Sequence, residues 1–175
     1  MKNSPLLLSI MLALLLLTST AQSQTTSVAA SDTFVLKLGR LWNFISLPLK
    51  MPPQVVSSLF PFGTSDAYGY LNGYMVLRTV RHGEGFWIKS VGYDSVVLIG
   101  ERVTTDTISV YDGWSILGSI SVPVDVTHLE SIPPGIILTV IVLNPRWPYG
   151  MGTKFLMPGW ACWIKTSGAG KIILK

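Results

Sequence analysis

Short apolar segments, separated by glycine and proline, run along the chain after residue 30. Their alternation and their β-branched and aromatic content are typical of strands, which the first half places at 33–38, 42–47, 68–70, 74–77, 86–90 and 95–99. The second half places strands at 107–110, 115–120, 136–143, 153–157, 160–166 and 171–174. The dipeptide Asn72-Gly73 predicts a hairpin turn between two of these segments.

Two short helical turns are predicted, at 54–60 and at 125–132, with Asp125 or Thr127 as the cap of the second. No long helix is expected after the leader. Strands of this length with frequent turns predict an all-β, mainly antiparallel fold, either a sandwich or a barrel, with one short helical turn in each half.

Two matching stretches organise this pattern: 83–89, GEGFWIK, and 159–165, GWACWIK. The separation of their tryptophans, Trp87 and Trp163, is only slightly larger than that of Trp42 and Trp114, which begin similar strands. Recurrence at a nearly constant separation indicates an internal duplication, with a longer loop in the second copy. We therefore divide the chain into β repeat 1, residues 38–110, and β repeat 2, residues 111–175.

The repeated residues are interpreted as structural. Gly83 and Gly159 are expected to form a turn or bulge before each aromatic strand, where a side chain would clash. The four repeat tryptophans are expected to fill equivalent core positions in the two copies, and a ligand platform is the alternative interpretation. These tryptophans are Trp42, Trp87, Trp114 and Trp163.

The N-terminus predicts an export signal. Lys2 precedes an apolar run over 6–17 that is too short to span a bilayer, and Ala21-Gln22-Ser23 has the small residues of a cleavage site. We expect a signal peptide over 1–23, cleavage near Ser23 and a flexible lead-in over 24–37, with an uncleaved anchor as the alternative. The protein would then be secreted, periplasmic or at the cell surface, with no membrane span after cleavage.

Composition narrows the classes of partner. The 175 residues carry a formal charge of +4, but only 13% are charged and the basic residues are scattered, so no nucleic-acid partner is expected. Cys162 is the sole cysteine, which excludes an intramolecular disulfide. It lies in an apolar strand, and we interpret it as a buried, unreactive thiol.

The segment 41–48, LWNFISLP, followed by 83–89, GEGFWIK, resembles a pattern of exported bacterial surface and multidomain exoproteins. In those proteins a G-W-N-x-I-S-L-P strand precedes G-x-G-Y-W-[IV]-K, often with a second copy. The resemblance covers residues 38–174 and implies an accessory β module without a catalytic residue set. The chain departs from the pattern at Ser115, in place of asparagine, and at Cys162, in place of an aromatic residue.

The sequence contains only weak matches to catalytic motifs. The nucleophile motif Gly-x-Ser-x-Gly is absent, and the two histidines, His82 and His128, fall at non-equivalent positions of the repeats. We expect polar loop histidines, no metal, no cofactor and no enzymatic activity. The hydrolase alternative requires one of these histidines beside a nucleophile or a carboxylate, or a carboxylate pair such as Glu84 and Glu101.

The binding candidates are aromatic. Trp147, Tyr149 and Trp160 are additional to the repeat tryptophans and flank an irregular loop of the second copy. Exposed aromatic rings can stack on sugars or anchor a protein partner. We predict a secreted, non-catalytic structural or interaction module whose partner is a cell-surface protein or a polysaccharide. The alternative is a small carbohydrate-binding module that uses these three residues.

Overall fold

The computed structural model describes residues 31–62, 64–144 and 152–175, and within them the fold is all-β, as the sequence predicts. The paired strands are antiparallel. The elements of the first half are β1 Ser31–Leu38, β2 Leu41–Ser46, β3 Leu49–Lys50, β4 Gln54–Val55, α2 Val56–Leu59, β5 Ala67–Tyr70, β6 Tyr74–Leu77, β7 Thr79–Val80, β8 Gly85–Ser90 and β9 Asp94–Arg102. Those of the second half are β10 Asp106–Val110, β11 Gly113–Gly118, β12 Val124–Asp125, η1 Val126–His128, β13 Glu130–Ile132, β14 Ile137–Val142, β15 Phe155–Leu156, β16 Ala161–Thr166 and β17 Gly170–Leu174.

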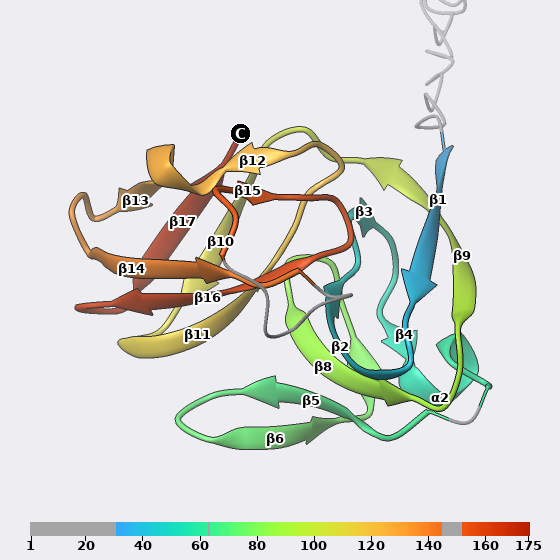
Figure 1. Ribbon diagram of the computed structural model, residues 1–175. Coiled ribbons are helices and arrows are strands. Elements are labelled where there is room, and N and C mark those ends of the chain that lie inside the picture. The colour runs from blue at the N-terminus through green and yellow to red at the C-terminus, as the bar shows by residue number, and fades with distance from the viewer. Residues whose placement is uncertain (1–30, 63, 145–151) are drawn as a thin grey trace, which may run out of the picture.

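The two halves lie side by side, the first in blue to green and the second in yellow to red (Figure 1). The larger sheets of the first half have the strand orders β1-β9-β3 and β2-β8-β5-β6. Those of the second half are β10-β17-β13 and β11-β16-β14, and each half adds one two-stranded pair, β4-β7 or β12-β15. Every described sheet has two ends, so the fold is a sandwich of open sheets and not a closed barrel.

Strand pairings recur at matching positions of the two halves. Phe44 lies opposite Trp87 in β2–β8, and Ile116 lies opposite Trp163 in β11–β16. Phe44 and Ile116 stand at the same place after the tryptophans that begin the first strand of each pair. The ladders β1–β9 and β10–β17 are related in the same way, so two ladders of each half correspond position by position.

Each half has its own hydrophobic core. In the first half the inward residues of the aromatic strand are Phe86 and Ile88, and in the second half they are Cys162 and Ile164, all with no exposed surface. They belong to two separate clusters of buried residues, one from each half. The alternation of strand side chains brings these residues to one face and leaves Trp87 and Trp163 on the other.

Two expected boundaries are corrected by the strand pairing. Residues 31–37 fall within the expected lead-in, but they form most of β1 and pair with β9 along their whole length, which confirms the strand predicted at 33–38 and corrects the boundary of the lead-in. Leu36 and Leu38 alternate inward and are buried, which explains why this segment is a strand. Residues 106–110, assigned to repeat 1, form β10 and pair with β17 of the second half.

The helical turns are shorter than expected. In the first half α2, Val56–Leu59, lies inside the predicted 54–60. In the second half the turn is only η1, Val126–His128, because 130–132 pairs with β17 as β13. Asp125 caps η1 by accepting a hydrogen bond from the Thr127 amide (3.0 Å). Hydrogen bonds from the side chain and then the backbone of Thr127 lower the pKa of Asp125. No helix among the described residues is long and apolar enough to cross a bilayer.

Candidate functional site: aromatic clusters and the junction of the halves

The repeat tryptophans do not lie in the two hydrophobic cores. Trp42 is 40% exposed, and Trp87, Trp114 and Trp163 are half-buried. This corrects the expected core positions for these residues. The strand Gly-Phe-Trp-Ile-Lys is apolar on both faces, so sequence alone could not decide which face packs inward.

An aromatic stack crosses from one half to the other. Phe44 has no exposed surface and stacks on Trp87 of its own half, with ring centroids 4.4 Å apart. Its ring also lies 5.9 Å from that of Trp163, which belongs to the second half. Among the described residues, the indole Nε1 of Trp87 is buried without a hydrogen-bond partner. The stacked rings of Phe44 and Trp87 therefore contact the second half through Trp163, at the junction of the halves.

Three further rings surround Trp163. Tyr70, Tyr74 and Trp114 contact it edge to face, with centroids 5.0, 6.2 and 6.0 Å away. Edge-to-face packing is the favourable geometry for aromatic pairs. Tyr74 is 63% exposed, and the ammonium of Lys165 lies 5.8 Å from the ring centroid of Trp114. We call Tyr74, Trp114, Trp163 and Lys165 cluster 2.

The first half has a similar group on β2, β5 and β8, in which Trp42, Trp87 and Lys89 stand at the positions of Trp114, Trp163 and Lys165. Trp42 lies opposite Lys89, and Tyr68 lies opposite Trp87. The rings of Trp42 and Tyr68 are 5.9 Å apart, again edge to face. We call Trp42, Tyr68, Trp87 and Lys89 cluster 1. Both clusters combine two tryptophans with the lysine that ends each Trp-Ile-Lys segment.

The glycines that precede the aromatic strands hold the two halves together. Gly83 and Gly159 have φ values of 84° and 83°, a region that glycine adopts without steric cost. The Ser46 amide donates to the carbonyl of Gly159, and the Gly118 amide donates to the carbonyl of Gly83, both at 3.0 Å. Because Ser46 and Gly118 occupy equivalent positions, the contact between the halves is approximately two-fold symmetric.

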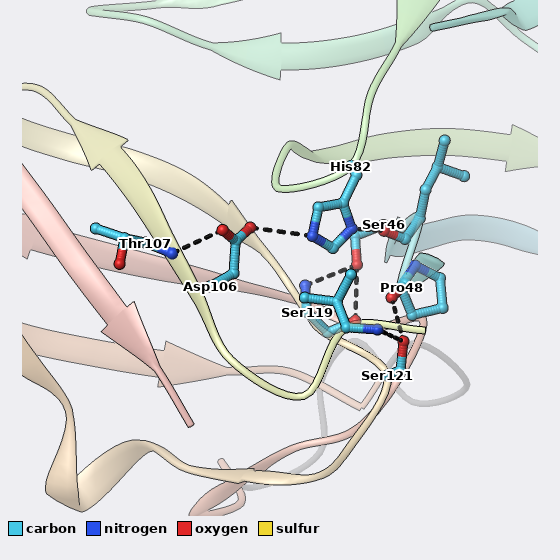
Figure 2. A network of polar contacts seen from close by, with 9 residues as sticks. Ser46, Pro48, His82, Asp106, Thr107, Ser119 and Ser121 are labelled. Atoms are coloured by element: carbon cyan, nitrogen blue, oxygen red, sulfur yellow. Dashed lines mark hydrogen bonds and ion pairs between the residues drawn. The ribbon is translucent and has the colours of Figure 1, made fainter. Parts of the chain in front are cut away.

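Figure 2 shows a buried hydrogen-bond network at this junction, in which Ser46 and Ser119 lie together. The Ser119 amide donates to Ser46 Oγ (2.9 Å), and the Gly159 amide donates to Ser119 Oγ (2.8 Å). Ser46 Oγ donates to the carbonyl of Trp160 (2.6 Å). Both hydroxyls are fully buried and fully partnered, so they tie together segments that are distant in the sequence.

His82 also joins the two halves (Figure 2). Its Nδ1 lies 2.9 Å from the carbonyl of Leu47, and its Nε2 lies 3.0 Å from Asp106 Oδ2. The other carboxylate oxygen of Asp106 accepts from the Thr107 amide (2.7 Å). Since both ring nitrogens face acceptors and the side chain is only 10% exposed, this imidazole has no free nitrogen with which to activate a nucleophile.

His128 lies apart from this network and is 81% exposed, 3.4 Å from Asp125 Oδ2. Residues 31–62, 64–144 and 152–175 contain no group of three side chains arranged to hold a metal ion. Both histidines therefore lie beside a carboxylate, and His128 Nδ1 also lies 3.2 Å from the hydroxyl of Thr127. The His82 ring is held on both sides at the junction, and the His128 ring lies on an exposed turn.

Two grooves lie beside the junction at equivalent positions. The larger, of about 520 Å³, is lined by His82, Gly83 and Asp106 together with Tyr70 and Tyr111. The smaller, of about 300 Å³, is lined by Phe34, Leu36, Ile45, Gly159 and Trp160. Both have mixed polar and apolar walls.

Only Trp160 of the three expected binding residues lies within the described part of the chain. Trp147 and Tyr149 lie outside the described residues. Trp160 is half-buried and packs against the second core, with its backbone held by Ser46. The sequence predicts Tyr68, Tyr70 and Tyr74 only as half-buried cross-strand neighbours, and it does not indicate that Tyr74 contacts Trp163 or that Lys165 lies against Trp114. Burial raises the pKa of the Cys162 thiol to about 12, which makes it unreactive.

Comparison of the chain with family models, with curated proteins and with solved structures found no match. The two clusters and the junction between the halves are the features of the chain that bear on its function.

Proposed function

We propose that this chain is an exported, non-catalytic interaction module made of two copies of one β unit, and that clusters 1 and 2 are its binding surfaces. The observation that carries the proposal is the exposure of large aromatic rings at these positions, 40% for Trp42 and 63% for Tyr74. Aromatic side chains bury a large apolar area at a low cost in side-chain entropy, which makes them common anchors of binding surfaces.

Several features support the rest of the proposal. The recurrence of strand pairings at matching positions of the two halves supports two copies of one unit. The leader over 1–23 and the resemblance to accessory modules of exoproteins support export. The engagement of both nitrogens of His82 supports a non-catalytic role, because that side chain serves to join the halves.

Carbohydrate binding is the second candidate, and the exposed rings of Trp42 and Tyr74 favour it. The C–H-rich face of a pyranose packs well against the electron-rich face of an aromatic ring. For this candidate, the proposed sugar-binding site is formed by the two clusters and not by the loop around Trp147 and Tyr149. Trp160 contributes less than expected, because it is half-buried against the second core.

Co-sedimentation with insoluble polysaccharides and affinity electrophoresis with soluble ones test both candidates. The double variant Trp42→Ala/Tyr74→Ala should weaken binding of any captured polysaccharide by about tenfold or more. The matched control is Tyr93→Ala, which removes a ring that is 82% exposed and outside both clusters. Undiminished binding by the double variant would contradict the assignment of the clusters, and no capture of any polysaccharide would remove the carbohydrate candidate.

A further inference from the structure

We propose that clusters 1 and 2 bind an acidic polysaccharide made of uronic acids, with Lys89 and Lys165 as the residues that recognise its carboxylates. The inference depends on the proposed function above and specifies its ligand. The same pairing of a tryptophan with a lysine occurs in each half: Trp42 lies directly opposite Lys89, and Trp114 lies directly opposite Lys165.

Opposite residues of an antiparallel pair project from the same face, with Cβ atoms about 5 Å apart. An ammonium group and an indole ring are therefore presented together at each position. In cluster 2 the Nζ of Lys165 is 5.8 Å from the centroid of the Trp114 ring. A uronic acid fits this spacing, because its carboxylate is attached directly to the sugar ring that would stack on the indole.

The charge of these faces has a single sign. By strand register, Lys89 and Lys165 are the only residues with a formal charge on the described sheet faces that carry the clusters. The remaining positions on these faces are aromatic, aliphatic, hydroxyl-bearing or glycine. Within the paired strands a carboxylate that approaches either face therefore meets a lysine, and the nearest acidic residues in the sequence, Asp66 and Asp112, precede β5 and β11 at the strand ends.

Neither lysine is neutralised within the protein. Both are exposed, and no carboxylate in the described part of the chain forms an ion pair with either of them. The ammonium of Lys165 lies 5.8 Å from the centroid of the Trp114 ring, near the outer limit of a cation–π contact, and this contact does not cancel its charge. A polymer that repeats an apolar ring face and a carboxylate complements both parts of each cluster.

Two equivalent clusters on one chain also suit a repeating ligand. A polymer long enough to reach both clusters makes the second contact intramolecular, which raises its apparent affinity above that of a short oligomer. A single sugar or disaccharide gains nothing from the second cluster.

The experiment measures dissociation constants of the mature chain for a soluble polyuronate and for the same polymer after reduction of its carboxylates to alcohols. The variants are Lys89→Gln, Lys165→Gln and their combination. The control is Lys171→Gln, which removes the same charge from an exposed position on β17 outside both clusters.

The native chain should bind the polyuronate at least about tenfold more tightly than the reduced polymer, and the difference should decrease at high salt. The combined lysine variant should lose this preference, and Lys171→Gln should retain it. Equal binding of both polymers by the native chain, or an equal loss in Lys171→Gln, would overturn the inference.

Other outcomes separate this inference from the function that it specifies. If both polymers bind equally and Trp42→Ala/Tyr74→Ala abolishes binding, the proposed function stands and the acidic ligand is wrong. If neither polymer binds while another polysaccharide is captured through Trp42 and Tyr74, the acidic ligand is wrong and the proposed function stands. Tighter binding of a single-stranded oligonucleotide than of the polyuronate would refute the assigned ligand class.

Discussion

Gly118 gives a direct test of how the two halves are joined, because its Cα lies against the backbone of the other half. A Cβ atom there would lie 2.9 Å from the carbonyl oxygen of Glu84, 2.9 Å from the carbonyl carbon of Gly83 and 3.0 Å from Ser46 Cβ. The φ of Gly118 lies outside the left-handed region, so alanine fits the local backbone. Any cost of Gly118→Ala must therefore come from the junction of the halves.

The expected magnitude follows from these distances. Restoring ordinary van der Waals separation requires the facing segments to move apart by about 0.5 Å. Overpacking of this kind costs about 1–3 kcal/mol. The same movement stretches the 3.0 Å bond from the Gly118 amide to Gly83 and the 2.9 Å bond from the Ser119 amide to Ser46 Oγ. Weakening them adds about 1 kcal/mol to the loss.

Differential scanning calorimetry of the chain measures the effect. A loss of about 2–4 kcal/mol predicts a fall in Tm of about 5–15 °C for a chain of this size. The control is Gly92→Ala, where the added Cβ meets no atom within 4 Å and the Tm should stay within about 2 °C of the native value. An unchanged Tm in Gly118→Ala would refute the close apposition of the two halves.

Three further predictions concern other parts of the chain. His82→Ala leaves the Leu47 carbonyl and Asp106 without their shared partner. The free energy of unfolding, measured in urea, should fall by about 1.5–3 kcal/mol. An unchanged midpoint would contradict the role of His82 in joining the halves. The Cys162 thiol should react with a thiol reagent at mildly alkaline pH only after denaturation, and rapid native reaction would contradict its burial. Mass spectrometry of exported protein should show cleavage near Ser23, whereas an intact leader would favour the anchor alternative.

The sequence predicted most of the strands because their signals are local. Alternation, glycine and proline breaks and the Asn72-Gly73 turn identified the β5–β6 hairpin, and Asn72 has the positive φ expected of a turn residue (53°). The turn in the second half was predicted too long, because 130–132 gains a partner in β17, at the end of the chain. Long-range pairing of this kind leaves no local pattern in the sequence.

The candidate site was less predictable than the strands. The sequence points to Trp147, Tyr149 and Trp160 because they have no counterpart in the first half, whereas the clusters are built mainly from residues that recur in both halves. Tyr74 reaches Trp163 only because the β5–β6 hairpin of the first half extends against β16 of the second. Such a contact depends on how two units dock, and the order of residues along one strand does not report it.

The sequence by itself determined the strand pattern and the presence of a Trp-Ile-Lys segment in each half, because these are visible in the local order of residues. Only the tertiary structure decided which face of each aromatic strand is buried. Phe86 and Ile88 fill a core, while Trp87 faces the junction. Both faces are apolar, so the choice follows from the docking of the halves, in which Phe44 is enclosed between Trp87 and Trp163.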